Sequence, residues 1–318
     1  MEKQKGRIIH LDIIRVICMI WVIALWHMRN YTQPLNWNLI SIQTMQQITF
    51  GCLAMFTFLS GYLAGGKRIS SVQNALSFYW NRIIRLYPLY FLSCISLWVV
   101  HMIDKKQLIT SILLVGELVG NPPSTIWFIN MIFLFYFFTP LLNAVEKPGR
   151  KIIIILTIGG IWYVTRKFCG TDIRLEYYWP FYSLGICANS FRFFQEKIMK
   201  EQENLISMVI GLILCAMAAG LGDGEFTILS YLCCISWGIF VLELSKILSR
   251  NKPVTKIIDF LAYSSMCAYL FHRAVFSFFQ ICFGNVHQII AWMLILPLLF
   301  LFSFIVQKVY DIIVQFFL

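Results

Sequence analysis

Among the ionisable side chains that interrupt long apolar stretches of this sequence are Arg15, His27 and His272. Placing such a group in an apolar segment is costly, so each of the three is a candidate for function. A neutral imidazole acts as a general base near pH 7, and an arginine stabilises negative charge in a dry site. The alternatives are an arginine whose head reaches the aqueous interface and histidines that merely line it.

A second group of basic residues lies in the polar stretch 66–88, where Arg82 and Arg85 are three residues apart. On a helix this spacing places both guanidinium groups on one face. Guanidinium forks suit the oxygens of a phosphate. Alternatively, the two arginines only anchor the next span on the cytoplasmic side of the membrane. The sequence leaves both interpretations open.

Neither a metal nor a nucleic acid is expected as a partner. Nine of the ten cysteines lie in apolar runs, only Cys169 lies in a polar connection, and none has the spacing of a metal site. The net charge of +11 would favour nucleic acid in a soluble protein, but here the positive residues lie between hydrophobic runs. They therefore indicate membrane topology.

The elements that carry these residues must be membrane helices. Hydrophobic residues make up 59% of the 318 residues and charged residues 13%, against about 25% charged in an ordinary soluble domain. This composition excludes a soluble enzyme, a disordered chain and a secreted disulfide scaffold. The apolar runs are continuous instead of alternating, which excludes a membrane β-barrel. We therefore predict an all-α, polytopic bundle of membrane helices.

About ten apolar runs are long enough, or nearly so, to cross a bilayer, which takes about 20 residues. An eleventh run, 107–120, is short, contains Glu117 and ends at two prolines that stop a helix. We predict that it lies on the outer side without crossing. The predicted spans are 9–29, 46–65, 86–103, 126–145, 151–165, 177–191, 205–221, 226–245, 257–282 and 288–307.

The distribution of charge decides the predicted orientation. With ten spans and the N-terminus inside, most of the 26 lysine and arginine residues fall on the cytoplasmic side, as the positive-inside rule requires. If 107–120 crossed, every later segment would invert and the balance would reverse. We therefore place both termini in the cytoplasm. We also expect a retained first helix without a cleavage site and a single domain over 1–318.

Four stretches, in this order along the chain, resemble the acyltransferase-3 family of bacterial membrane O-acyltransferases. The ordered set covers nearly the whole chain and is more specific than any single motif in it. The stretches are Leu11–Arg15 (LDIIR) followed by His27, Phe56–Leu63 (FTFLSGYL), Trp80–Pro88 (WNRIIRLYP) and Tyr263–His272 (YSSMCAYLFH).

The resemblance implies a multi-pass enzyme of the bacterial inner membrane, surrounded by membrane lipids. Such an enzyme moves an acyl group, usually acetyl, from cytoplasmic acyl-CoA to a hydroxyl of a cell-surface glycan or glycolipid. The implied donor is acetyl-CoA. The resemblance assigns Arg15, His27 and His272 to the catalytic set, and Arg82 and Arg85 of the inner face to donor binding. Arg68, in the same inner stretch, is a further candidate for the phosphates of the donor.

Two alternatives remain open at the level of the sequence. A transporter or flippase for a glycan or lipid-linked sugar would also use ten spans and a polar interior, although it would not need these basic residues in this order. Ser60 is a candidate carrier of a covalent acyl group. A serine beside a glycine such as Gly61 more often serves close helix packing.

The first helix departs from the family in its spacing, because eleven residues separate Arg15 from His27 where the family has ten. At about 100° per residue, the two side chains would point roughly 120° apart on a regular α-helix. A π-bulge absorbs one residue and restores the shared face, and such bulges gather at functional sites. We therefore predict a π-bulge between Cys18 and Trp26. A regular helix would instead leave His272 as the better candidate base.

Overall fold

The computed structural model describes residues 8–33, 41–66, 68–191, 195, 196, 198, 202–222 and 224–315. The predicted location of the two chain termini concerns residues outside these ranges. The helices are α1 (Ile9–Ile20), η1 (Trp21–His27), η2 (Met28–Asn30), α2 (Ile42–Gly65), α3 (Val72–Val99), α4 (Lys105–Ile112), α5 (Trp127–Ala144), α6 (Pro148–Cys169), α7 (Ile173–Ser190), α9 (Leu205–Leu221), α10 (Ile228–Leu248), α11 (Lys252–Phe283) and α12 (Gln288–Val314).

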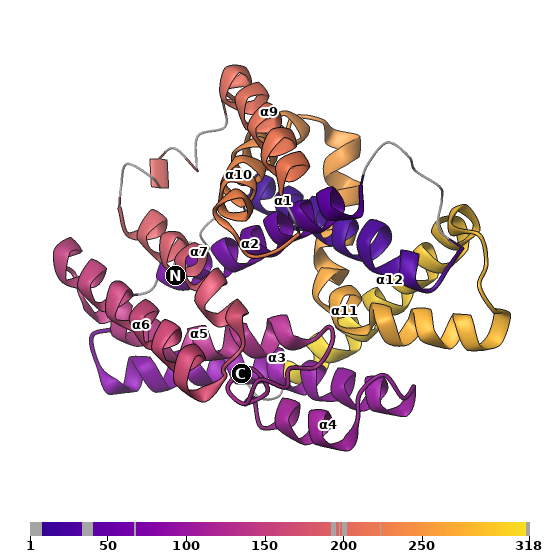
Figure 1. Ribbon diagram of the computed structural model, residues 1–318, viewed down its shortest axis with the longest axis horizontal. Helices are drawn as coiled ribbons and strands as arrows, with labels where there is room; N and C mark the ends of the chain where they lie inside the picture. The colour runs from indigo at the N-terminus through magenta and orange to yellow at the C-terminus, as the bar shows by residue number, and fades with distance from the viewer. Residues whose placement is uncertain are drawn as a thin grey trace.

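The helices pack as a bundle around the first two (Figure 1). α1 and α2 lie in the middle, α9 and α10 lie on one side of them, α3 to α6 on the opposite side, and α11 and α12 at the remaining side.

Polar side chains fix several helix starts, because Ser41, Ser71 and Asn204 each accept a hydrogen bond from a backbone N–H in the first turn of α2, α3 and α9. These caps satisfy donors that the helix itself leaves free.

Eight helices are long and apolar enough to cross a membrane: α1 with η1 and η2, α2, α3, α5, α6, α10, α11 and α12. α9 is apolar but has 17 residues, and α7 is not among the eight. Each predicted span overlaps a helix, or for 9–29 the consecutive segments α1, η1 and η2, so the prediction of an all-α membrane bundle is confirmed for the described part of the chain. The count of ten spans stays a prediction.

The span predicted to start at 86 begins earlier in the structure, within the polar stretch 66–88. α3 starts at Val72 and runs to Val99 without a break at Pro88. The cause lies in its first half, which is too polar to read as a span but is capped by Ser71 and forms regular helix. Arg82 and Arg85 therefore lie within a long helix, and that helix fixes their shared face.

Contacts between connections define two ends of the bundle, which we call the outer end and the inner end. At the outer end, the backbone N–H of Asp172 donates to the carbonyl of Glu117 at 2.8 Å, and Gln46 donates to the carbonyl of Gly224 at 2.7 Å. At the inner end, Lys151 donates to Ser190 at 2.9 Å. α7 therefore starts at the outer end and finishes at the inner end.

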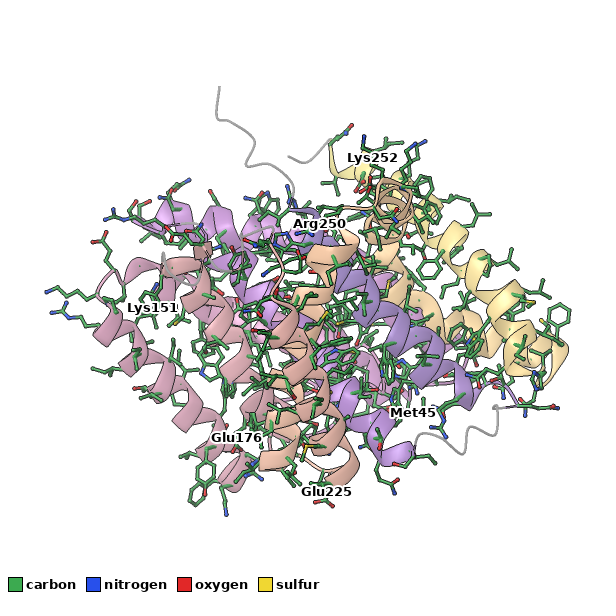
Figure 2. All side chains as sticks on the ribbon, turned by 90° about the horizontal axis from the view of Figure 1, so that it is seen from above. Met45, Lys151, Glu176, Glu225, Arg250 and Lys252 are labelled. Atoms are coloured by element: carbon green, nitrogen blue, oxygen red, sulfur yellow. The ribbon has the colours of Figure 1, made fainter. Side chains whose placement is uncertain are left out.

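Four labelled charged residues lie at opposite edges of the bundle (Figure 2). Arg250 and Lys252 lie near one edge of the bundle, and Glu176 and Glu225 lie toward the opposite edge. A cationic inner end is what the positive-inside rule requires of a cytoplasmic face. The orientation of the bundle in the membrane stays a prediction.

The segment 107–120 does not form a helix that could cross the bundle. α4 has 8 residues, which at about 1.5 Å per residue is roughly 12 Å. The chain then turns back at the outer end, where Gly120 has φ +63° and the position of an added Cβ would lie 2.6 Å from the carbonyl oxygen of Gly170. Only glycine satisfies both conditions, so this residue fixes the connection against the start of α7.

Two glycines allow α2 and α7 to approach closely. A Cβ added to Gly61 would lie 2.1 Å from the carbonyl oxygen of Tyr182, and one added to Gly185 would lie 2.2 Å from that of Phe58. Small residues let membrane helices pack backbone against backbone. This contact holds α2, which carries Ser60, in a fixed position against α7.

Candidate active site

The first membrane helix changes its geometry before it reaches His27. α1 ends at Ile20, and Trp21–His27 forms a π-helical segment, so the predicted π-bulge is confirmed. Trp292 of α12 donates its indole N–H to the carbonyl oxygen of Ala24 within this segment at 2.9 Å. The wider turn takes up the extra residue, and it brings His27 into the interior of the bundle.

His27 meets His272 of α11. Their facing nitrogens, Nδ1 of His27 and Nε2 of His272, are 2.7 Å apart. The side chain of His272 is fully buried. The fold therefore brings these two candidate residues into contact, although 245 positions separate them in the sequence.

A backbone carbonyl determines which nitrogens of the pair carry protons. Nδ1 of His272 lies 2.7 Å from the carbonyl oxygen of Tyr269, and this oxygen only accepts. Nδ1 of His272 is therefore the donor, and in a neutral ring its Nε2 accepts from Nδ1–H of His27. Nε2 of His27 is left with a free lone pair. This is the tautomer that a general base needs.

A cavity of about 700 Å³ lies toward the inner end, next to the donor-binding residues assigned by the family resemblance. Its charged lining residues are Arg15, Arg82, Arg85 and Asp311. The guanidinium carbon of Arg82 lies 4.8 Å from the ring centroid of Tyr136, which holds the arginine by a cation–π contact. The structure thus brings together three of the predicted site residues from α1 and α3 in one positively charged space.

A second cavity, of about 610 Å³, lies toward the outer end. His27 lines it, together with Arg174, Arg273 and Glu225. The guanidinium carbon of Arg174 lies 4.3 Å from the ring centroid of Trp127. This cavity has the polar groups needed to hold a hydrophilic molecule beside His27.

The two cavities share one wall residue, Tyr269 of α11. The rings of Phe56 and Phe128 pack against it, with centroids 6.3 and 5.8 Å from its own, and they line the inner cavity. The hydroxyl of Tyr269 donates to the carbonyl oxygen of Thr125 at 3.2 Å. We call these three rings the septum. They separate Arg15 on the inner side from His27 on the outer side.

Two predicted site residues line neither cavity: His272, which contacts His27, and Arg68, which lies apart from the others. Arg68 forms an ion pair with Glu146, and its side chain is 74% exposed. Ser60 does line the inner cavity, while the neighbouring Gly61 makes the close helix contact described above. Among the described residues, no group of three or more His, Cys, Asp or Glu side chains is placed to hold a metal ion.

Sequence reasoning missed the roles of Tyr269 and Arg273. Tyr269 lies three positions before His272, so it shares a face of α11 with it, and that spacing was a readable signal. Arg273 follows His272 directly and gave no signal of its own. Its guanidinium group contacts the ring of Tyr31 and the carbonyl oxygen of Ser124, and only the fold brings these two residues near it.

Comparison with known protein families gives one match. A family model described as an acyltransferase domain matches residues 8–307. No curated protein and no solved structure matched the chain. The matched range contains both cavities' arginines and both histidines.

Proposed function

This chain belongs to the acyltransferase-3 family, and we propose that it moves an acetyl group from acetyl-CoA in the inner cavity to a hydroxyl of a cell-surface glycan or glycolipid in the outer cavity. The observation that carries the proposal is the pair of cavities that meet at Tyr269, with Arg15, Arg82 and Arg85 on one side and His27, held by His272, on the other. The site of action is the inner membrane of a bacterium.

The inner cavity suits the donor because CoA is rich in phosphate. Arg82 and Arg85 come from one face of α3 and Arg15 from α1. Arginine binds phosphate bidentately through its planar fork. With the phosphates held there, the pantetheine arm extends to the septum, and Arg15 stabilises charge on the donor near its thioester end. The rings of the septum part during transfer, so that the thioester carbonyl meets the acceptor hydroxyl at His27.

The transfer step uses the proton arrangement of the histidine pair. Nε2 of His27 takes the proton of the acceptor hydroxyl as its oxygen attacks the thioester carbonyl. A C–O bond forms, the C–S bond breaks, and the proton on His27 passes to the departing thiolate. The imidazolium formed in between is stabilised by its hydrogen bond to His272, which the carbonyl of Tyr269 holds in position.

Direct transfer between the two cavities requires no covalent acyl-enzyme. Ser60 lies on the donor side, where it lacks the base that His27 supplies on the other side of the septum. Membership of an acyltransferase family also argues against the transporter alternative.

The experiment uses the purified full chain in lipid nanodiscs with radiolabelled acetyl-CoA. Release of CoA and label in a glycan or glycolipid fraction are both measured. His27→Gln should lower transfer by about 10²–10⁴, the usual contribution of a general base. His101→Asn is the matched control, because His101 is exposed and lines neither cavity. Equal transfer by the His27 variant and the control would overturn the proposal.

A further inference from the structure

A third cavity, of about 240 Å³, lies beside the histidine pair and is almost wholly apolar. It lies between the end of the first membrane helix, α11 and α12. Its lining includes Met28, Tyr31, Phe276, Phe279, Leu294 and Leu298. An apolar cavity of about 150 Å³ already binds benzene in a protein core. The space here therefore suits part of a longer hydrocarbon chain.

The wall of this apolar cavity continues onto the lipid-facing surface of the bundle. Phe283, Leu294 and Leu298 line the cavity and are 68%, 59% and 49% exposed. On a membrane bundle, exposed apolar side chains of this kind lie against lipid tails. A hydrocarbon chain can therefore enter from the bilayer sideways.

Two aromatic residues in the wall of the apolar cavity connect it to the histidine pair and to Arg273. The ring centroid of Phe276 lies 5.7 Å from that of His272. The ring of Tyr31 lies 5.7 Å from that of Phe276, and the guanidinium carbon of Arg273 lies 6.0 Å from the Tyr31 ring. The apolar cavity and the outer cavity are thus neighbours across one layer of side chains.

Arg273 is the cation at this boundary, and it differs from the nearby Arg174. Arg174 forms an ion pair with Asp172 at 2.8 Å. Arg273 donates from Nη1 to the carbonyl oxygen of Ser124 at 3.2 Å, forms no ion pair among the described residues, and its Nε is buried without an acceptor. A buried N–H without an acceptor costs about 1–3 kcal/mol. An anion placed against Arg273 would remove that cost.

From these neighbours we propose that the acceptor is a phosphate-bearing lipid that carries the sugar to be acetylated. Its hydrocarbon chain lies in the apolar cavity, its phosphate lies against Arg273, and its hydroxyl lies in the outer cavity at Nε2 of His27. This inference rests on the proposed function and names its acceptor class. It needs all three features together, because a free glycan would leave the apolar cavity unused and a neutral lipid would leave Arg273 without its anion.

The test measures binding, so that it is independent of catalysis. Tritiated farnesyl phosphate and farnesol are titrated against the full chain in phosphatidylcholine nanodiscs. The wild type should bind farnesyl phosphate more tightly than farnesol. Arg273→Gln should weaken farnesyl phosphate binding by about tenfold, equal to losing about 1.4 kcal/mol, and leave farnesol unchanged. Leu294→Trp fills the cavity and should weaken both.

Met293→Trp is the matched control, because Met293 neighbours Leu294 on α12, is 71% exposed and does not line the cavity. Melting temperatures check that all variants fold. Equal affinity of the wild type for the two probes, or equal binding by Leu294→Trp and Met293→Trp, would overturn the inference. Loss of farnesyl phosphate binding in phosphatidylglycerol nanodiscs would also overturn it, by assigning the cavity to bulk anionic phospholipid.

The result is separable from the proposed function. His27→Gln should keep full farnesyl phosphate binding while losing transfer. If transfer is absent in every variant but binding follows the expected pattern, the proposed function fails and the lipid site stands. If transfer depends on His27 but the probes do not discriminate, the lipid site alone fails.

Discussion

The carbonyl oxygen of Tyr269 lies 2.7 Å from Nδ1 of His272, so one residue connects the barrier between the cavities to the proton chain of the histidine pair. Its side chain forms part of the septum, and its backbone selects the tautomer of His272. Movement of this turn of α11 would therefore change both access and basicity. This coupling motivates the first two predictions.

Replacing His272 by glutamine should lower the transfer rate by about 10², the lower end of a general-base contribution. The reason is that His27 would lose the partner that fixes its Nδ1 as a donor. His272 lines neither charged cavity, so its loss should not remove a contact with acetyl-CoA. KM for acetyl-CoA should therefore change by no more than about twofold, whereas losing about 1.4 kcal/mol of binding free energy would raise it tenfold. Steady-state kinetics in nanodiscs measure both constants, and a change confined to KM would contradict this role.

Replacing Tyr269 by alanine should open the septum and let water at His27 in the outer cavity reach the donor thioester. A closed active site excludes water and so prevents hydrolysis of a reactive intermediate or donor. We expect the hydrolysis of acetyl-CoA without any acceptor to rise several-fold, while Tyr269→Phe, which keeps the ring, should remain near the wild-type rate. Release of CoA, followed with a thiol reagent, distinguishes the two variants. Identical hydrolysis in both would show that the ring is not a barrier.

Replacing Arg82 or Arg85 by glutamine should raise KM for acetyl-CoA by about tenfold each, since a charge-assisted hydrogen bond contributes about 1.5–3 kcal/mol. Arg68→Gln is the matched control, because its side chain is exposed and paired with Glu146. It should leave KM unchanged. Equal effects of all three changes on KM would contradict donor binding. They would mean that the arginines act only on the orientation of the protein in the membrane or on the amount of protein produced.

Replacing Gly61 by alanine should destabilise the bundle by about 1–3 kcal/mol, the usual cost of overpacking. The added methyl group would collide with the carbonyl oxygen of Tyr182. Gly160→Ala is the control within α6, where an added Cβ meets nothing within 4 Å. Thermal unfolding in detergent compares them. A loss in the control as large as in Gly61→Ala would remove close packing as the cause.

Glu117 should make stability depend on pH. Its carboxylate lies outside the membrane-spanning helices, and burial raises its pKa well above the usual value. The folded protein therefore holds this proton more tightly than the unfolded chain, and stability falls as pH rises from the unfolded pKa toward the folded one. Glu117→Gln should raise the melting temperature more at pH 8 than at pH 5. An equal shift at both values would contradict this.

Much of the site could be predicted from the sequence because membrane burial makes polar residues conspicuous. His27 and His272 stood out in apolar runs, and the one-residue excess after Arg15 predicted the π-helical segment. The start of α3 at Val72 was not predicted, because apolar length does not mark the polar first half of this helix. The neighbours of Arg273 could not be predicted, since Tyr31 and Ser124 approach it only through the packing of three separate segments.

The septum has a consequence for the electrical insulation of the membrane. Two polar cavities that approach each other from opposite ends shorten the insulating path from about 30 Å of hydrocarbon to three aromatic rings. The transmembrane voltage should then fall mainly across Tyr269, Phe56 and Phe128, where each elementary charge that moves across 100 mV is worth about 2.3 kcal/mol. A charge that moves between Arg15 and His27 during the transfer step would cross most of that voltage, and the reaction rate would depend on the energised state of the cell.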